Sequence, residues 1–239
     1  MINKLKNEKI NKDLKELYSK YTSEFLKEWK EWYGQEPPSR MNEFGIIDVE
    51  KYDAENGILV IGRETNGVEG WFENNSDNDL FINWMHEISV GKCGLPKRPN
   101  IWYNTARYIM TVRGEKEKSL VFDKKDLLPE LGTMAFTNIN KVGGGSSSGK
   151  SYWKLYEKDI VIELMVKEIE IIKPKYIILC DRFFEKFLTV QNATRFAGND
   201  SALEDCINNG RLLIAYHPAA RMSKEKMLDK LENQMSYNK

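Results

Sequence analysis

The first part of the chain carries apolar side chains at steps of three and four residues, which predicts an amphipathic helix over residues 5–33. Lysines and glutamates fill the opposite face, and a proline-containing stretch at 35–38 ends the pattern. We interpret this segment as a helix that packs on the outside of a main domain, with binding of a partner as the alternative. The apolar positions are Ile10, Leu14, Leu17, Tyr21, Phe25, Trp29 and Tyr33.

Three short apolar runs predict buried strands, a further strand with a more polar far end is expected at 134–142, and helical patterns lie between the strands. Alternating strands and helices favour a parallel sheet that is covered by helices. We therefore predict an α/β fold, a three-layer α/β/α sandwich with a four-stranded parallel central sheet. An N-terminal helical extension over residues 1–44 would precede an α/β domain over residues 45–239. The expected strands are 57–62, 134–142, 176–180 and 211–216, and the expected helices are 78–89, 100–112, 152–172 and 223–235.

Charge and cysteine content restrict the possible partners. Lysine plus arginine equals aspartate plus glutamate, 36 each, so no overall basic field indicates nucleic acid, although a local basic face can exist within a neutral total. Cys93, Cys180 and Cys206 are too few and too scattered for a disulfide framework or a four-ligand zinc or iron–sulfur site. We therefore expect no metal and no cofactor. Without an apolar leader or a long apolar stretch, we also expect a cytoplasmic location and no membrane partner.

Polar side chains follow each expected strand. Ligands of parallel α/β sheets bind in the crevice beyond the carboxyl ends of the strands, so these side chains are the candidates for a site. A proline after the histidine fixes the next φ, although a strand-end histidine can also serve only to satisfy a backbone group. A carboxylate, an amide and an imidazole are therefore expected to converge. In strand order the residues are Arg63 with Glu64, Asn138 with Asn140, Asp181, and His217 with Pro218.

Residues 144–151 read Gly-Gly-Ser-Ser-Ser-Gly-Lys-Ser and match the phosphate-binding loop pattern, between an expected strand and an expected helix. In that interpretation Lys150 would reach the terminal phosphates and Ser151 a metal ion. Polar residues before the loop and bulky residues after it fit the pattern poorly, and a glycine–serine loop that matches by composition is the alternative. His86 falls inside an expected helix, where we interpret it as a packing or capping residue.

The motifs at the strand ends resemble those of the uracil-DNA glycosylase superfamily, in the family's order. Residues 60–67, Val-Ile-Gly-Arg-Glu-Thr-Asn-Gly, look like its first motif, a strand and a loop that bears the water-activating acid. Residues 136–141 are similar to the strand whose asparagine reads the base, and residues 216–221 to the His-Pro motif. Residues 169–179 resemble the helix–Pro–strand unit of the iron–sulfur branch, but the cluster cysteines are absent.

This resemblance implies a role for each motif. Glu64 would align water and stabilise an oxocarbenium-like sugar, and His217 would donate a hydrogen bond to the departing base. Asn138 would read the base edge, and Trp71 or Phe72 would stack on the extruded base unless they are core residues. Arg221 replaces the family's apolar wedge, and the proline beside the acid is missing. The further substrate-binding candidates are Gly62, Arg63, Thr65, Asn66, Asn140, Pro218 and Arg221.

The sequence leaves three functional hypotheses. The first is a DNA glycosylase-like hydrolase that cleaves the N-glycosidic bond of a uracil-like or deaminated base, with DNA as its partner. The second is a catalytically inactive module of the same fold that binds nucleic acid or nucleotide. The third is a phosphate-loop nucleotide-binding protein that uses residues 144–151.

Overall fold

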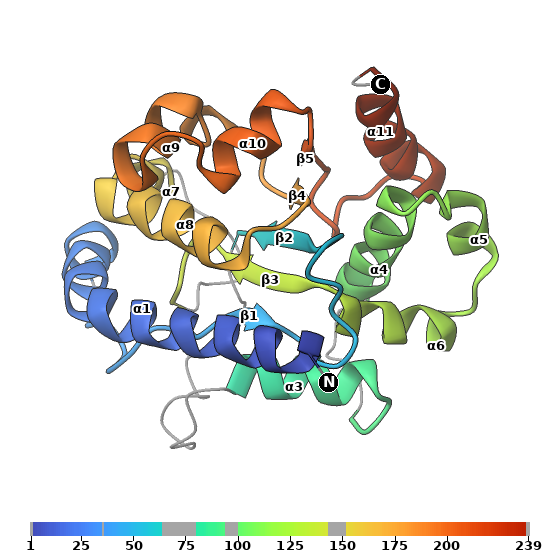
Figure 1. The fold of residues 1–239 in the computed structure, drawn as a ribbon, viewed down its shortest axis with the longest axis horizontal. Coiled ribbons are helices and arrows are strands. Elements are labelled where there is room, and N and C mark those ends of the chain that lie inside the picture. The colour runs from blue at the N-terminus through green and yellow to red at the C-terminus, as the bar shows by residue number, and fades with distance from the viewer. Residues whose placement is uncertain (1, 35, 64–79, 94–99, 143–151, 238–239) are drawn as a thin grey trace.

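A computed structural model of the chain describes residues 2–34, 36–63, 80–93, 100–142 and 152–237. Within these residues a five-stranded sheet lies at the centre, with helices on both of its faces (Figure 1). This arrangement confirms the α/β class that the alternating pattern predicts. No helix among the described residues is long and apolar enough to cross a membrane.

The four expected strands are all present, although the one expected at 134–142 ends at Asn138. Each is parallel to its neighbour in the order β3-β2-β4-β5. A fifth strand, β1, pairs antiparallel with β3 at the edge, so the sheet is mixed. The expected layout of four parallel strands alone therefore differs from the structure. The strands are β1 Gly45–Ile46, β2 Ile58–Gly62, β3 Ala135–Asn138, β4 Tyr176–Leu179 and β5 Leu212–Ile214.

Strand β1 was not predicted from the sequence, because it has only two residues and is completed on its outer side by the side chain of Asn11. The amide of Asn11 donates to the carbonyl of Ile46 at 2.9 Å and accepts from the backbone N–H of Ile46 at 2.8 Å. A two-residue strand leaves no hydrophobic period, and a distant helix supplies the hydrogen bonds that a neighbouring strand would otherwise make.

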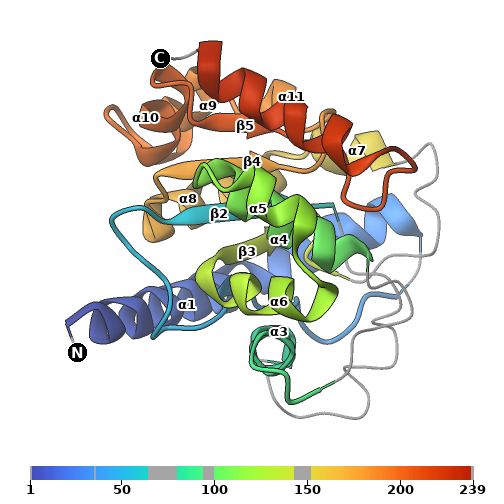
Figure 2. The same cartoon turned by 90° about the vertical axis from the view of Figure 1, so that its right-hand side faces the viewer.

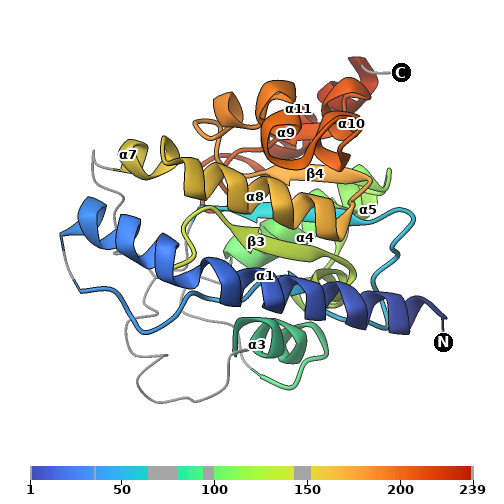
Figure 3. The same ribbon diagram turned by 60° about the vertical axis from the view of Figure 1, so that its left-hand side comes forward.

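Two helical layers enclose the sheet. Figure 3 shows α1, α8, α9 and α10 in front of the strands, and Figure 2 shows α4, α5 and α11 on the opposite face. The first layer consists of α1 Ile2–Tyr33, α8 Asp159–Ile172, α9 Val190–Ala197 and α10 Ala202–Asn208. The second consists of α4 Asn100–Val112, α5 Lys116–Val121 and α11 Lys224–Tyr237. The remaining helical elements are α3 Leu80–Ser89, α6 Lys124–Leu127, η2 Leu128–Thr133, α7 Tyr152–Tyr156 and η3 Glu185–Phe187.

Helix α1 packs along α8 on the outside of the sheet, and its buried side chains join the same hydrophobic core as the strands. The hydroxyl of Tyr21 donates to Glu163 of α8 at 2.6 Å. The buried stripe differs from the expected one at its edges, because Tyr18 is buried where Leu17 was expected, and Tyr33 is exposed. Burial of one helical face supplies most of the stability of such a helix.

The expected helix over 152–172 is divided into α7 and α8. Lys158 adopts an extended backbone, with φ −77° and ψ 127°, and Asp159 then begins α8 in the position where an acidic residue favours a helix start. Periodicity alone predicted one helix because both halves carry apolar residues. The break gives the short helix α7 its own direction, and Tyr156 of α7 contributes to the strand-end cluster described below.

Candidate functional site

The carboxyl ends of the parallel strands meet at one edge of the sheet. Gly62 of β2 pairs with Asn138 of β3, and the parallel pairing continues in the hydrogen bond from Asn140 N to the carbonyl of Arg63 at 2.9 Å. On the other side of β2, Ile61 pairs with Leu179 of β4, which in turn pairs with Ile214 of β5. The residues that follow these four strands therefore share one edge, as the fold logic predicts.

Gly62 and Asn138 are in direct contact. A Cβ atom built on Gly62 would lie 2.3 Å from Oδ1 of Asn138, so only glycine fits here without displacing the amide. Asn138 is 1% exposed, and its Nδ2 has no hydrogen-bond partner among the described residues. An unpaired buried donor costs about 1–3 kcal/mol, which an acceptor on a ligand would recover. Among the described strand-end candidates, Asn138 therefore has a buried hydrogen-bond donor without a partner in the protein.

The imidazole of His217 is held in a defined orientation. Its Nδ1 accepts the backbone N–H of Ala219 at 3.2 Å, which assigns the remaining proton of the neutral ring to Nε2. Desolvation by the surrounding protein lowers the pKa of His217, although the residue has an exposed face. The positive charge of Arg63 lowers this pKa further, and Asp181 acts in the opposite direction. A neutral imidazole that donates from Nε2 is therefore the main form near neutral pH.

Helix α4 fixes the segment that carries His217. The hydroxyl of Tyr108 donates to the carbonyl of Tyr216 at 2.9 Å, and Nδ2 of Asn104 donates to the carbonyl of Pro218 at 2.7 Å. These two hydrogen bonds hold the backbone on both sides of the histidine. The sequence gives no signal for them, because the partners are more than 100 residues apart along the chain.

Asp181 is not a free carboxylate at this edge. Its Oδ2 accepts from Nε of Arg63 at 2.7 Å and from the hydroxyl of Tyr156 at 2.5 Å, while its Oδ1 accepts the N–H of Phe183 at 2.9 Å. Asp181 is 2% exposed, so its charge is balanced by Arg63 rather than by water. The carboxylate thus positions a guanidinium at the end of β2, close enough to His217 to influence its titration.

The other strand-end candidates differ in exposure. Oδ1 of Asn140 accepts the N–H of Val142 at 3.0 Å, and this buried side chain closes the turn after β3. Pro218 is buried and Arg221 is exposed. The predicted acid Glu64, with Thr65, Asn66, Trp71 and Phe72, lies outside the described residues, as does the phosphate-loop candidate at 144–151.

A buried ion pair lies beneath this edge. Nζ of Lys141 is 2.6 Å from Oε1 of Glu168 and donates to Thr137 at 2.6 Å, and both charged side chains are at most 1% exposed. Desolvation lowers the pKa of Lys141, and the carboxylate of Glu168 opposes that effect. The pair joins the turn after β3 to α8, so it fixes the backbone next to Asn138 and Asn140.

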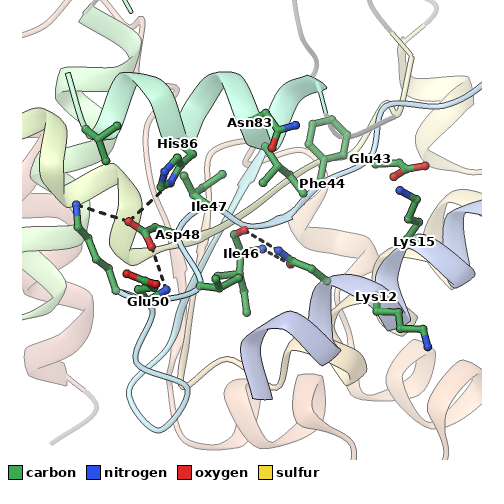
Figure 4. Close-up of a pocket in the computed structure, with 15 residues that line it drawn as sticks. Lys12, Lys15, Glu43, Phe44, Ile46, Ile47, Asp48, Glu50, Asn83 and His86 are labelled. Atoms are coloured by element: carbon green, nitrogen blue, oxygen red, sulfur yellow. Dashed lines mark hydrogen bonds and ion pairs between the residues drawn. The ribbon is translucent and has the colours of Figure 1, made fainter. Parts of the chain in front are cut away.

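A separate groove of about 730 Å³ lies at β1, between α1 and α3, near the amino end of β3 (Figure 4). Its floor is apolar, with Phe44 and Ile46, and lysines and carboxylates are mixed along its walls. His86 lies here, with its Nδ1 3.7 Å from Oδ2 of Asp48, beyond hydrogen-bond distance. The groove lies at the β1 edge of the sheet, and His217 follows β5 at the opposite edge. We therefore do not assign the groove to the strand-end site.

Two further results limit what can be assigned to the site. Among the described residues, no three His, Cys, Asp or Glu side chains gather in a way that could hold a metal ion. Comparisons with family models, with curated proteins and with solved structures find no match to this chain. The function must therefore be argued from the geometry of the strand-end residues.

Proposed function

We propose that the protein is a hydrolase, similar to uracil-DNA glycosylases, that cleaves the N-glycosidic bond of a uracil-like or deaminated base in DNA. The observation that carries the proposal is the buried, unpaired amide of Asn138, which shares an edge of the sheet with the oriented imidazole of His217. An amide offers both a donor and an acceptor to a base edge, and such polar groups give strong discrimination when they are buried.

In this proposal the base would lie across the end of β2, between Asn138 and His217. Cleavage of the glycosidic bond leaves negative charge on the departing base. The neutral His217 would donate from Nε2 to the base oxygen where that charge develops, and the guanidinium of Arg63 would stabilise the same charge. Glu64, the residue after Arg63, would supply the carboxylate that aligns water and stabilises the sugar cation.

The test is base release from labelled oligonucleotides that contain uracil, hypoxanthine or xanthine, read as strand cleavage at abasic sites. We expect release from at least one of these substrates, and a loss of about 100- to 1000-fold in His217→Ala because a positioned donor is removed. His86→Ala is a matched control, since His86 is the other histidine of the chain and lies in the separate groove. Absence of abasic product, or equal activity in His217→Ala, would overturn the proposal.

A second candidate function is a module of the same fold that binds DNA without cleaving it. The Arg63–Asp181 pair favours this alternative, because a cation is fixed at the strand end where the resemblance expects catalysis by an acid. Retention of DNA without release of any base would select this function. The phosphate-loop hypothesis has weaker support, since the helix after residues 144–151 is the five-residue α7.

A further inference from the structure

We propose that the turn at residues 182–187, together with Tyr216 and Lys230, forms a docking surface for single-stranded nucleic acid beside the strand-end site. The inference rests on the proposed function, because it takes DNA as the ligand, and it specifies the form of DNA that binds. We call these residues the rim surface. The turn begins directly after Asp181, and Tyr216 directly precedes His217, so a nucleic-acid strand bound here would lead into the strand-end site.

Two pairs of a cation and an aromatic ring form the centre of the rim surface. The guanidinium of Arg182 lies 4.8 Å from the ring centroid of Phe183, and Nζ of Lys230 lies 4.5 Å from that of Tyr216. The pairs are neighbours, because β4 and β5 are in register at Leu179 and Ile214, and Asp181 and Tyr216 each follow two residues later. The same turn carries a third pair, with Nζ of Lys186 4.7 Å from the ring centroid of Phe187.

The charges on the rim surface act on one another. Desolvation lowers the pKa of Lys230, the carboxylate of Glu185 opposes this effect, and the positive charge of Arg182 adds a smaller lowering. Lys186 lies 3.9 Å from Glu157, at the limit of an ion pair between exposed groups. A phosphate placed between Arg182 and Lys230 would be attracted by both cations, and this attraction depends on the salt concentration.

Phe183 is presented to solvent by the residues on either side of it. It is 37% exposed, whereas the next residue, Phe184, is fully buried and packs edge-on against Tyr156 with centroids 5.2 Å apart. The carboxylate of Asp181 also accepts the backbone N–H of Phe183 at 2.9 Å. The turn is therefore anchored from below, and part of the Phe183 ring remains accessible to solvent.

Aromatic rings that are at least partly accessible and lie beside cations are suited to a single strand. Unpaired bases can stack on such rings whatever their identity, while lysine and arginine contact the phosphates. In a duplex the faces of the bases are already stacked on one another, so the rings would find only base edges and sugars. The same surface also suits a target base that must leave the stack before it reaches the strand-end site.

Fluorescence anisotropy with labelled oligothymidylate, and with a duplex of equal length, tests this inference. We expect tighter binding of the single strand, and Phe183→Ala should weaken it about tenfold, the effect of one lost stacking contact. Arg182→Glu should also weaken binding and reduce its salt dependence. Arg195 and Phe196 on α9 form a matched control, with a guanidinium-to-ring distance of 4.6 Å, and Phe196→Ala should leave binding within about twofold.

Several outcomes would overturn the rim surface. These are no binding of oligothymidylate by the wild-type protein, equal binding by Phe183→Ala and wild type, or an equal loss in Phe196→Ala. Circular dichroism of each variant separates loss of binding from loss of fold. If Phe183→Ala weakens binding but no base is ever released, only the proposed function fails. If bases are released and Phe183→Ala binds normally, only the rim surface fails.

Discussion

Nε of Arg63 lies 2.7 Å from Oδ2 of Asp181, and the two charges act in opposite directions on His217. Removing the charge of Arg63 or of Asp181 should therefore shift the pKa of His217 in opposite directions. The pKa of His217 should rise in Arg63→Gln and fall in Asp181→Asn, as measured by NMR of the imidazole protons. The signals are assigned with His86→Ala, the other histidine. No shift in either variant would show that the charges do not reach the ring.

The lowered pKa of His217 also predicts a pH dependence of stability. The unfolded imidazole titrates near 6.5, above the folded value, so the unfolded chain binds more protons as pH falls below about 6.5. The contribution of His217 to the free energy of unfolding is therefore complete above that pH and decreases as pH falls toward the folded pKa. Urea denaturation across this range should show a smaller decrease in His217→Gln than in wild type.

Gly62→Ala should disturb the site through Asn138. The added Cβ would lie 2.3 Å from Oδ1 of Asn138 and 3.1 Å from the ring of Phe136, so the amide must move. Overpacking of this kind costs about 1–3 kcal/mol of unfolding free energy. The double variant Gly62→Ala with Asn138→Gly removes the closest atom. Its loss of unfolding free energy should be smaller than the sum of the losses in the two single variants. Additive losses in denaturant unfolding would exclude the contact.

Breaking the buried ion pair should be strongly destabilising. Glu168→Gln leaves the ammonium of Lys141 buried without a counter-charge, which typically costs about 3–5 kcal/mol. Replacing both residues, as in Lys141→Met with Glu168→Leu, removes both desolvated charges and should cost less than Glu168→Gln alone. Thermal unfolding of the three proteins checks this order. A single variant as stable as wild type would contradict it.

Tyr108→Phe should weaken the attachment of the His217 segment to α4 without creating a large cavity in the core. The variant removes the donor to the Tyr216 carbonyl and should cost about 0.5–1.5 kcal/mol, the net value of one hydrogen bond. Tyr103→Phe on the same helix is the matched control. If the hydrogen bond orients His217, kcat for base release should fall in Tyr108→Phe more than in Tyr103→Phe, while KM changes little. Equal kcat values would restrict Tyr108 to a role in packing.

The parts of the fold that were predicted correctly are those with a continuous local signal. The strands near 57–62, 176–180 and 211–216 consist mostly of apolar residues, a pattern that burial on both faces of a sheet favours. The break at Lys158 was missed because it interrupts the backbone and not the apolar pattern. The short helices α5 and α9 were missed as well, since few turns of helix leave a weak period.

The candidate site was predictable only in part for a related reason. Strand ends share an edge in any parallel sheet, so the polar residues that follow them could be grouped in advance. What those residues do depends on partners far away in sequence. Asp181 was expected in the crevice as a carboxylate, but Tyr156 and Arg63 engage it, and the latter is separated from it by 118 positions. No local sequence pattern indicates such pairs of distant residues.

The amide of Asn11 takes the place of a sixth strand at β1, so the first helix covers this edge of the sheet. An uncovered edge strand offers its backbone groups to other chains. A protein shortened to begin after α1 would leave the outer N–H and C=O of Ile46 open, together with the face of α8 that α1 covers. Such a fragment is expected to form β-paired dimers or aggregates, because α1 no longer covers the backbone groups of β1.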